Sequence, residues 1–325
     1  MNEEEIRPSK IFDEYLDLAK QDSVTYFKNV EKRNINCPAC DSTGEHSFDK
    51  YGFSYEVCPC CQSLFVSPRP IASAFTKFYT ESSSSKYWAS TFYKDTAEAR
   101  REKLWKPKAC LIRDILQKYD ASLFTLIDIG GGYGLFAEEF RLLTGKEPLI
   151  IEPSPELAAA CRERSLKVVE NFLEDVTSSD LPLGPKVFVS FELFEHLHDP
   201  YHFLRQVKKQ MNSGDIFIFT TLSGSGVDIQ ALWENSKSIM PPHHLNFLNP
   251  RSIEILLSRL RLENLSITTP GKLDIDILTN NFESIKDRFW RTFITTSSED
   301  EKLAWQKMIS ETGWSSHMMV VCRKV

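Results

Sequence analysis

Four cysteines stand in two pairs whose spacing suits metal binding. Cys37 and Cys40 form the first pair, Cys58 and Cys61 form the second, and seventeen residues separate the pairs. Two residues lie between the members of each pair, so each pair can form a tight turn that directs two thiolates at one ion. The set predicts a four-cysteine zinc site. Because four ligands leave no open position, we expect the zinc to be structural, with a redox role for either pair as the alternative.

A glycine-rich segment, residues 125–136, has the pattern of a ligand-binding turn. Apolar strand-forming residues flank Asp128, glycines follow, and apolar residues then recur at helical spacing, which predicts strand, tight turn and helix. Glycine backbone can approach a ligand closely, and the first N–H groups of the helix point into the turn. Glu152 ends the next apolar stretch, 22 residues after Gly130, where a carboxylate can accept hydrogen bonds from ribose hydroxyls.

The spacing of these glycines separates two cofactor classes. A dinucleotide fingerprint starting at Gly130 would need a third glycine at position 135, which is leucine. The pattern of an aspartate followed by alternate glycines instead resembles motif I of the class I S-adenosylmethionine (SAM) methyltransferases. The alternative is a turn that only connects strand to helix, and the coupled Glu152 argues against it. The glycines in question are Gly130, Gly131, Gly132 and Gly134.

The resemblance extends beyond the glycine turn. Residues 61–70, 191–200, 242–250 and 269–276 are similar to segments of a broad methyltransferase family whose members pair a SAM domain with an N-terminal zinc ribbon. The similarity covers roughly residues 37–325. It implies SAM and structural zinc as cofactors. It also implies a small-molecule acceptor, often a nucleotide-linked sugar, in surface-glycan or natural-product pathways.

The predicted cofactor site lies at the carboxyl ends of the strands, where ligands bind in open α/β sheets. We expect Glu152 to bind the ribose and Phe172 to pack on the adenine. Glu192 is the expected partner of the methionine ammonium, and Asp128 is expected to anchor the turn amides or a water. The full predicted set is Asp128, Gly130, Gly131, Gly132, Gly134, Glu152, Pro153, Asn171, Phe172, Phe191 and Glu192.

Two histidines are the candidate catalytic bases. Because the sulfonium already activates the methyl group, alignment of the acceptor supplies much of the rate, but an oxygen or carbon acceptor must also lose a proton. His196 follows the fourth predicted strand, and His244 follows a long loop after the fifth; each has a structural role as its alternative. The sugar C-methyltransferases that the chain resembles carry Tyr-His-Glu-His in the segment equivalent to residues 241–244, and the tyrosine and the glutamate are absent here.

Other residues near these bases have candidate roles. Tyr79, Tyr87 and His243 are expected to contact the acceptor, the two tyrosines from an aromatic-rich lid whose alternative is a plain helical core. A divalent metal held by His196, His198 and His243 is a further alternative, although no D-x-D pattern accompanies them.

Regular alternation of strands and helices from residue 123 predicts an α/β fold with a doubly wound, seven-stranded Rossmann-like sheet. The resemblance implies that the last strand is inserted antiparallel beside the sixth. The predicted strands are 123–129, 148–152, 166–169, 186–191, 215–221, 263–269 and 317–322. Helices are predicted near 134–144, 155–164, 199–211, 250–260 and 281–312.

The same patterns divide the chain into four parts. Residues 1–36 form an N-terminal helical segment, with an amphipathic helix within 9–32. Residues 37–70 form the zinc ribbon, residues 71–120 a helical lid with a flexible serine loop at 81–86, and residues 121–325 the SAM domain.

Composition narrows the remaining alternatives. The net charge of −6 gives no long-range attraction for nucleic acid, the acidic N-terminus is no secretory signal, and no run is long enough to span a membrane. Eight cysteines without a signal peptide indicate reduced thiols or metal ligands rather than disulfides, so we expect a cytoplasmic protein. The segment after the fourth strand lacks the [N/D]-P-P-[Y/F/W] pattern of nucleobase-amine enzymes. A zinc-ribbon RNA methyltransferase and a non-catalytic interaction protein stay as alternatives, and the oligomeric state stays open.

Overall fold

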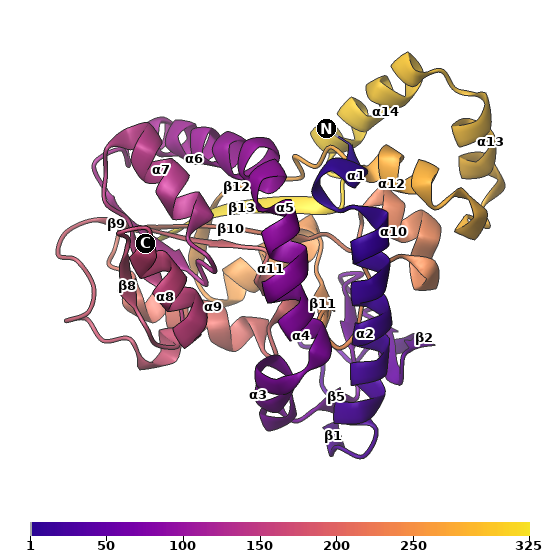
Figure 1. Ribbon diagram of the computed structural model, residues 1–325, viewed down its shortest axis with the longest axis horizontal. Helices are drawn as coiled ribbons and strands as arrows, with labels where there is room; N and C mark the ends of the chain where they lie inside the picture. The colour runs from indigo at the N-terminus through magenta and orange to yellow at the C-terminus, as the bar shows by residue number, and fades with distance from the viewer. Residues whose placement is uncertain (1) are drawn as a thin grey trace.

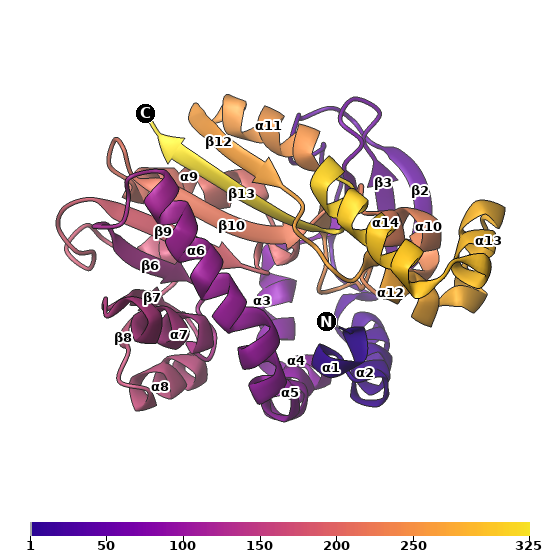
Figure 2. The ribbon, with the colours of Figure 1, turned by 90° about the horizontal axis from the view of Figure 1, so that it is seen from above.

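A computed structural model describes residues 2–325, and a seven-stranded sheet forms its centre (Figures 1 and 2). In spatial order the strands are β12 (Leu262–Thr268), β13 (His317–Lys324), β10 (Ile216–Leu222), β9 (Lys186–Phe191), β6 (Thr125–Ile129), β7 (Leu149–Ile151) and β8 (Lys167–Val169). β13 runs antiparallel to both of its neighbours, and the pairs from β10 to β8 are parallel. The predicted doubly wound sheet and its inserted last strand are confirmed.

Helices cover both faces of this sheet because successive strand residues point to opposite sides. Leu126 packs with α6 (Lys106–Lys118) and α7 (Leu135–Thr144), whereas Ile127 and Ile129 pack with α9 (Pro200–Gln210) and α11 (Pro250–Arg259). The short helix α8 (Pro155–Glu163) packs beside α7 through Cys161. One-turn helices η3 (Leu173–Asp175) and η4 (Phe194–His196) follow β8 and β9.

A second sheet carries the cysteine pairs and takes one strand from far along the chain. Its order is β11 (Asn246–Phe247), β4 (Leu64–Val66), β3 (Phe53–Val57) and β2 (Glu45–Lys50), all antiparallel. β3 and β4 lie on either side of the second cysteine pair in the chain. Because β11 pairs with β4, the ribbon shares a sheet with the segment that carries His244.

Helices of the N-terminal half lie alongside each other (Figure 1). α2 (Ser9–Phe27) contacts η1 (Trp88–Phe92) through Phe12 and Phe92. The short strands β1 (Lys32–Arg33) and β5 (Arg69–Pro70) pair beside it. The other elements are α1 (Glu3–Ile6), α3 (Ala72–Glu81), α4 (Ser83–Tyr87), α5 (Tyr93–Arg100) and η2 (Arg101–Trp105).

The expected flexible serine loop at 81–86 is wrong. α4 begins at Ser83, and the Ser82 side chain accepts a hydrogen bond from the backbone N–H of Ser85. Serine favours helix starts because its hydroxyl satisfies one of the free N–H groups there. Asp22 of α2 accepts a second hydrogen bond, from the Ser84 backbone N–H at 2.7 Å. A serine run whose composition predicts a loop therefore forms a capped helix here.

The continuous helix expected at 281–312 is also wrong, because Asp287 and Ser298 cap two separate helices. These are α13 (Arg288–Thr296) and α14 (Glu299–Thr312), which group with α12 (Asp274–Asn280) at one end of the sheet (Figure 2). The remaining elements are α10 (Val227–Leu232), η5 (Trp233–Asn235) and η6 (Phe282–Ser284). Within residues 2–325 no helix is both long and apolar enough to cross a membrane.

Candidate functional site

The glycine turn joins β6 to α7 with the backbone geometry that its sequence predicts. Gly130, Gly132 and Gly134 have φ of 72°, 56° and 73°, in the left-handed region that favours glycine. A Cβ at Gly134 would lie 2.7 Å from Leu166 Cδ1, so a larger residue there would collide with the core. A Cβ at Gly132 would meet no atom within 4 Å among the described residues, so the backbone is open there. The turn thus offers accessible backbone at the start of a helix.

Glu152 lies directly beside this turn at the end of β7. Its Oε2 accepts a hydrogen bond from Gly132 N at 2.9 Å, and its Oε1 accepts one from Ser154 N at 3.0 Å. Burial raises the pKa of Glu152, and the two backbone N–H groups oppose that rise. Asp128 is 2% exposed, and burial together with the nearby Glu152 raises its pKa to about 7. Two buried carboxyl groups therefore flank open glycine backbone, a donor and acceptor set that fits a ribose-bearing cofactor.

The other predicted cofactor residues divide into exposed and buried positions. Asn171 and Phe172 are exposed just after β8, with Phe172 58% exposed, and Pro153 is half-buried after Glu152. Phe191 is buried and packs edge-on against Phe136 of α7, with ring centroids 4.6 Å apart. Gly131 lies inside the turn, where a Cβ would approach Ile150 to 2.7 Å. Phe191 and Gly131 therefore contact core residues next to the glycine turn.

Glu192 occupies a polar cluster that the sequence did not reveal. Its Oε1 accepts a hydrogen bond from Thr220 at 2.7 Å and lies 3.4 Å from Lys108 Nζ and 3.5 Å from His317 Nδ1. Burial favours a higher pKa for Glu192, but His317 and Lys108 dominate and lower it to about 2. The residue has a φ of 52°, unusual for glutamate. One feature of the sequence could have placed Lys108 in this cluster. It precedes the buried Ile112 by four residues, so the two side chains share one face of the helix.

Residues 88–105 lie over the glycine turn. Tyr93 stacks on Tyr133, with ring centroids 4.4 Å apart, and the Tyr133 hydroxyl donates to the Ala89 carbonyl at 2.8 Å. Among residues 2–325, the buried Nε of Arg100 and Nε1 of Trp105 have no hydrogen-bond partner. The segment thus presents unsatisfied donors in the interior beside the turn.

His196 and His244 are brought together, with ring centroids 4.7 Å apart. The His244 Nδ1–H donates to the Ser238 carbonyl at 2.6 Å, which assigns the proton to Nδ1 and leaves Nε2 as an acceptor. Burial lowers the pKa of His196 to about 4 and that of His244 to about 3, so both rings are neutral at neutral pH. Glu195, which the sequence analysis missed although it adjoins His196, is 2% exposed and accepts from Thr221 Oγ1 at 2.9 Å.

The predicted acceptor residues lie at different distances from this pair. His243 is buried, with its ring centroid 6.4 Å from that of His196 and its Nε2 3.2 Å from Ser84 Oγ. Tyr79 is 42% exposed and meets the His243 ring edge-on at 5.9 Å. Tyr87 instead donates its hydroxyl hydrogen bond to Glu14 of α2 at 3.0 Å. Tyr79 and His243 therefore adjoin the histidine pair, and Tyr87 faces α2.

The alternative metal set of three histidines is wrong. His198 Nε2 lies 2.8 Å from the Pro70 carbonyl, and its ring packs edge-on against Phe75. The donor atoms that gather are those of Glu195, His196 and His244. His198 therefore faces Pro70 at the end of β5, which lies outside the central sheet.

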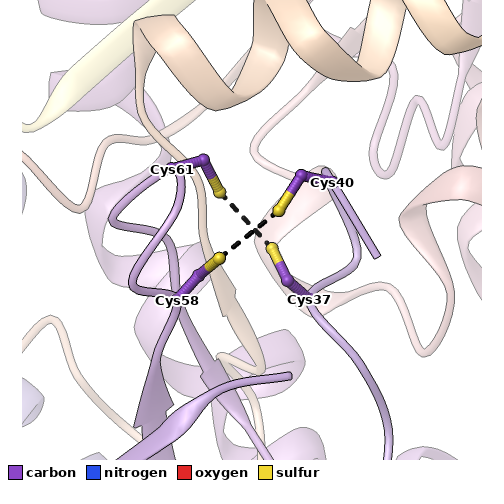
Figure 3. A group of neighbouring side chains, drawn as sticks. All are labelled: Cys37, Cys40, Cys58 and Cys61. Carbon is purple, nitrogen blue, oxygen red and sulfur yellow. Dashed lines mark hydrogen bonds between the residues drawn. The ribbon is translucent and has the colours of Figure 1, made fainter. Parts of the chain in front are cut away.

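The four paired cysteines converge on one point (Figure 3). The Cys37 and Cys61 sulfurs are 3.5 Å apart, and those of Cys40 and Cys58 are 3.3 Å apart. Zinc–sulfur bonds of about 2.3 Å would place tetrahedral sulfurs about 3.8 Å apart, so a small contraction separates this cluster from an ideal zinc site. Cys60 is exposed and lies outside it. The residues present therefore fit a structural zinc ion.

Comparisons with known proteins agree with this geometry. A family model described as "Methyltransferase domain" matches residues 94–267, just over half of the 325 residues. No curated protein matches the chain.

Three similar solved structures are distant in sequence. One is the plantazolicin methyltransferase BpumL in complex with SAH, at 11% identity, covering 77% of this chain and 93% of that chain with a TM-score of 0.48. Another is a SAM-dependent methyltransferase from Archaeoglobus fulgidus, at 14% identity, 66% and 94% coverage and a TM-score of 0.44. A third is a possible histamine N-methyltransferase from Thermotoga maritima, at 16% identity, 72% and 98% coverage and a TM-score of 0.44. Because the family model matches more than half of the chain, the chain belongs to the methyltransferase family.

Proposed function

We propose that the protein transfers a methyl group from SAM to an oxygen or carbon of a small molecule, a nucleotide-activated sugar or surface-glycan precursor. The observation that carries the reaction type is the half-buried pair of His196 and His244, 4.7 Å apart between ring centroids. His196 follows β9 and His244 precedes β11. Both lie at the end of the central sheet where the glycine turn and Glu192 also lie. The sugar class is supported by the sequence resemblance of residues 191–200 and 242–250.

Cofactor binding is proposed for the residues around the glycine turn. Glu152 accepts hydrogen bonds from the ribose hydroxyls, and the exposed Phe172 ring packs on the adenine. All three contacts of Glu192 go to Oε1, so Oε2 has no partner within the described chain and can accept from the methionine ammonium. The proposed set is Asp128, Gly130, Gly131, Gly132, Gly134, Glu152, Pro153, Asn171, Phe172, Phe191 and Glu192.

The histidine pair removes the proton from the acceptor. SAM supplies the methyl group on a positively charged sulfur, so no further activation of the donor is required. His244 is the first candidate because its Nδ1–H is fixed by Ser238, which turns the lone pair of Nε2 away from that carbonyl. His196 is the second candidate. Tyr79 and His243, which adjoin the pair, are proposed to shape the acceptor pocket.

Zinc is proposed to stabilise the ribbon, which supports the loop that carries His244. The ion would be bound by Cys37, Cys40, Cys58 and Cys61, whose sulfurs already converge. Asn249 donates from Nδ2 to the Cys61 carbonyl at 2.8 Å, so the second cysteine turn contacts the segment just after His244. We also propose that residues 71–120 act as a lid on the SAM domain, residues 121–325.

Labelled SAM offered in parallel to nucleotide sugars, glycan lipids, and tRNA with rRNA tests this function. We expect the labelled methyl group in the small-molecule or glycan-lipid pool. Label in RNA would overturn the acceptor class, and full turnover by His244→Ala would remove that residue as the base.

A further inference from the structure

We propose that Glu195, His196 and His244 form a second metal site, for a divalent first-row transition ion. Each residue offers one donor atom, and these atoms all lie within 4.8 Å of one another. Glu195 and His196 belong to η4, whereas His244 comes from the loop before β11. The backbone N–H of Leu245 donates to the Glu195 carbonyl at 2.8 Å, so the two segments are fixed against each other beside the donors.

The hydrogen bonds around the three residues orient them as metal ligands. Histidine ligands nearly always donate their other ring N–H to a carbonyl or carboxylate, which turns the free lone pair toward the metal. His244 does this through Nδ1 and the Ser238 carbonyl. Glu195 Oε2 accepts from Thr221 Oγ1 at 2.9 Å. Two of the three side chains, those of His244 and Glu195, therefore have their orientation fixed by a second group.

Glu195 also lacks a basic side chain as a partner among the described residues. Glu195 is 2% exposed, and no lysine or arginine in residues 2–325 forms an ion pair with it. Lys108 instead lies 3.4 Å from Glu192 Oε1. An ionised carboxylate is costly to bury without a paired charge, so a divalent ion bound by the same three residues would stabilise the ionised form of Glu195.

The donor types define which ions and which acceptors fit. Two imidazole nitrogens and one carboxylate oxygen suit zinc, iron(II), cobalt(II) or manganese(II), rather than calcium. Three protein ligands leave open positions, so an acceptor hydroxyl or keto oxygen can coordinate the ion.

This inference rests on the proposed methyl transfer and assigns the two histidines to metal binding. A coordinated hydroxyl loses its proton more readily. The O–H bond breaks and the proton passes to water. The oxygen electron pair then forms the O–CH3 bond as the S–CH3 bond breaks, leaving the neutral thioether of S-adenosylhomocysteine.

Cobalt(II) titration of the full-length protein, with zinc already in the four-cysteine site, tests the proposal. We expect one further equivalent of cobalt(II), with the weak visible absorption of nitrogen and oxygen coordination and no thiolate charge-transfer band. Glu195→Gln and His244→Asn should each weaken this binding at least tenfold. The matched control is His198→Gln, a nearby histidine outside the cluster, which should bind cobalt(II) as the wild type does. Circular dichroism checks that each variant is folded.

Two results would overturn the metal site. One is a wild-type protein that takes up no cobalt(II) beyond the zinc site. The other is unchanged affinity in a folded Glu195→Gln or His244→Asn variant. Either result with intact label transfer leaves the proposed function standing. Cobalt binding without SAM binding in calorimetry would instead reject the proposed function and keep the metal site.

Discussion

The Tyr55 hydroxyl donates a 2.7 Å hydrogen bond to the backbone carbonyl of His244. Tyr55 is a fully buried residue of β3 in the ribbon, and His244 lies in the loop of the SAM domain. Arg69 reinforces the same contact by donating to the Leu245 carbonyl at 3.2 Å and to Asn246 Oδ1 at 2.8 Å. The ribbon therefore fixes the backbone on both sides of a proposed catalytic residue.

Removing the Tyr55 hydroxyl should slow methyl transfer without weakening SAM binding. Tyr55→Phe keeps the buried ring but leaves the His244 carbonyl without its donor, at a cost of about 1 kcal/mol of stability. We expect kcat to fall several-fold and the SAM dissociation constant to stay unchanged, measured by label transfer and calorimetry. Tyr51→Phe, on the same hairpin, is the control and should keep full kcat. Equal effects of the two variants would contradict a positioning role for Tyr55.

Loss of zinc should slow methyl transfer more than Tyr55→Phe does, again without weakening SAM binding. Cys58→Ser removes one ligand, so the ribbon should lose its metal and its hold on the 241–249 loop. Elemental analysis should give about one zinc equivalent for the wild type and for Cys60→Ser, whose thiol is exposed outside the cluster. Less than about half an equivalent in metal-replete wild-type protein would rule out the four-cysteine zinc site.

The buried Asp128 should give the apo protein a measurable pH dependence. Its pKa in the folded state, about 7, lies above the ordinary value of 3.8. The unfolded chain releases this proton first as pH rises, so folding stability from this group is complete below about pH 4 and is lost up to about pH 7. The side chain of Asp128→Asn cannot ionise, so this variant should not lose that stability as the pH rises. We expect its melting temperature, relative to wild type, to rise between pH 4.5 and 8, and a constant difference would contradict the assignment.

Much of the cofactor region could be predicted because its signals are local. The glycine turn lies within ten residues of one strand and one helix, and Glu152 ends the very next strand, so pairing of β6 with β7 brings them together. The cysteine pairs are likewise two short turns whose spacing alone specifies four ligands.

The residues that the sequence did not reveal depend on contacts between distant segments. Glu192 meets His317 because β13 pairs with β10 in a register that places His317 opposite Leu222. β11 has only two residues and joins a strand about 180 positions earlier, too short a pattern to recognise. Glu195 looked like an ordinary acidic neighbour of His196, and only the fold of the 241–249 loop places His244 beside both.

Isothermal titration of SAM into wild type, Glu152→Ala and Glu147→Gln tests the central claim most directly. Glu152→Ala removes the carboxylate proposed to hold the ribose. Glu147→Gln changes an exposed residue just before the opposite end of β7. We predict one SAM per wild-type chain, at least tenfold weaker binding for Glu152→Ala because charge-assisted hydrogen bonds are worth about 1.5–3 kcal/mol, and unchanged binding for Glu147→Gln. No SAM binding by the wild type, or equal affinity in Glu152→Ala, would contradict the site at the glycine turn.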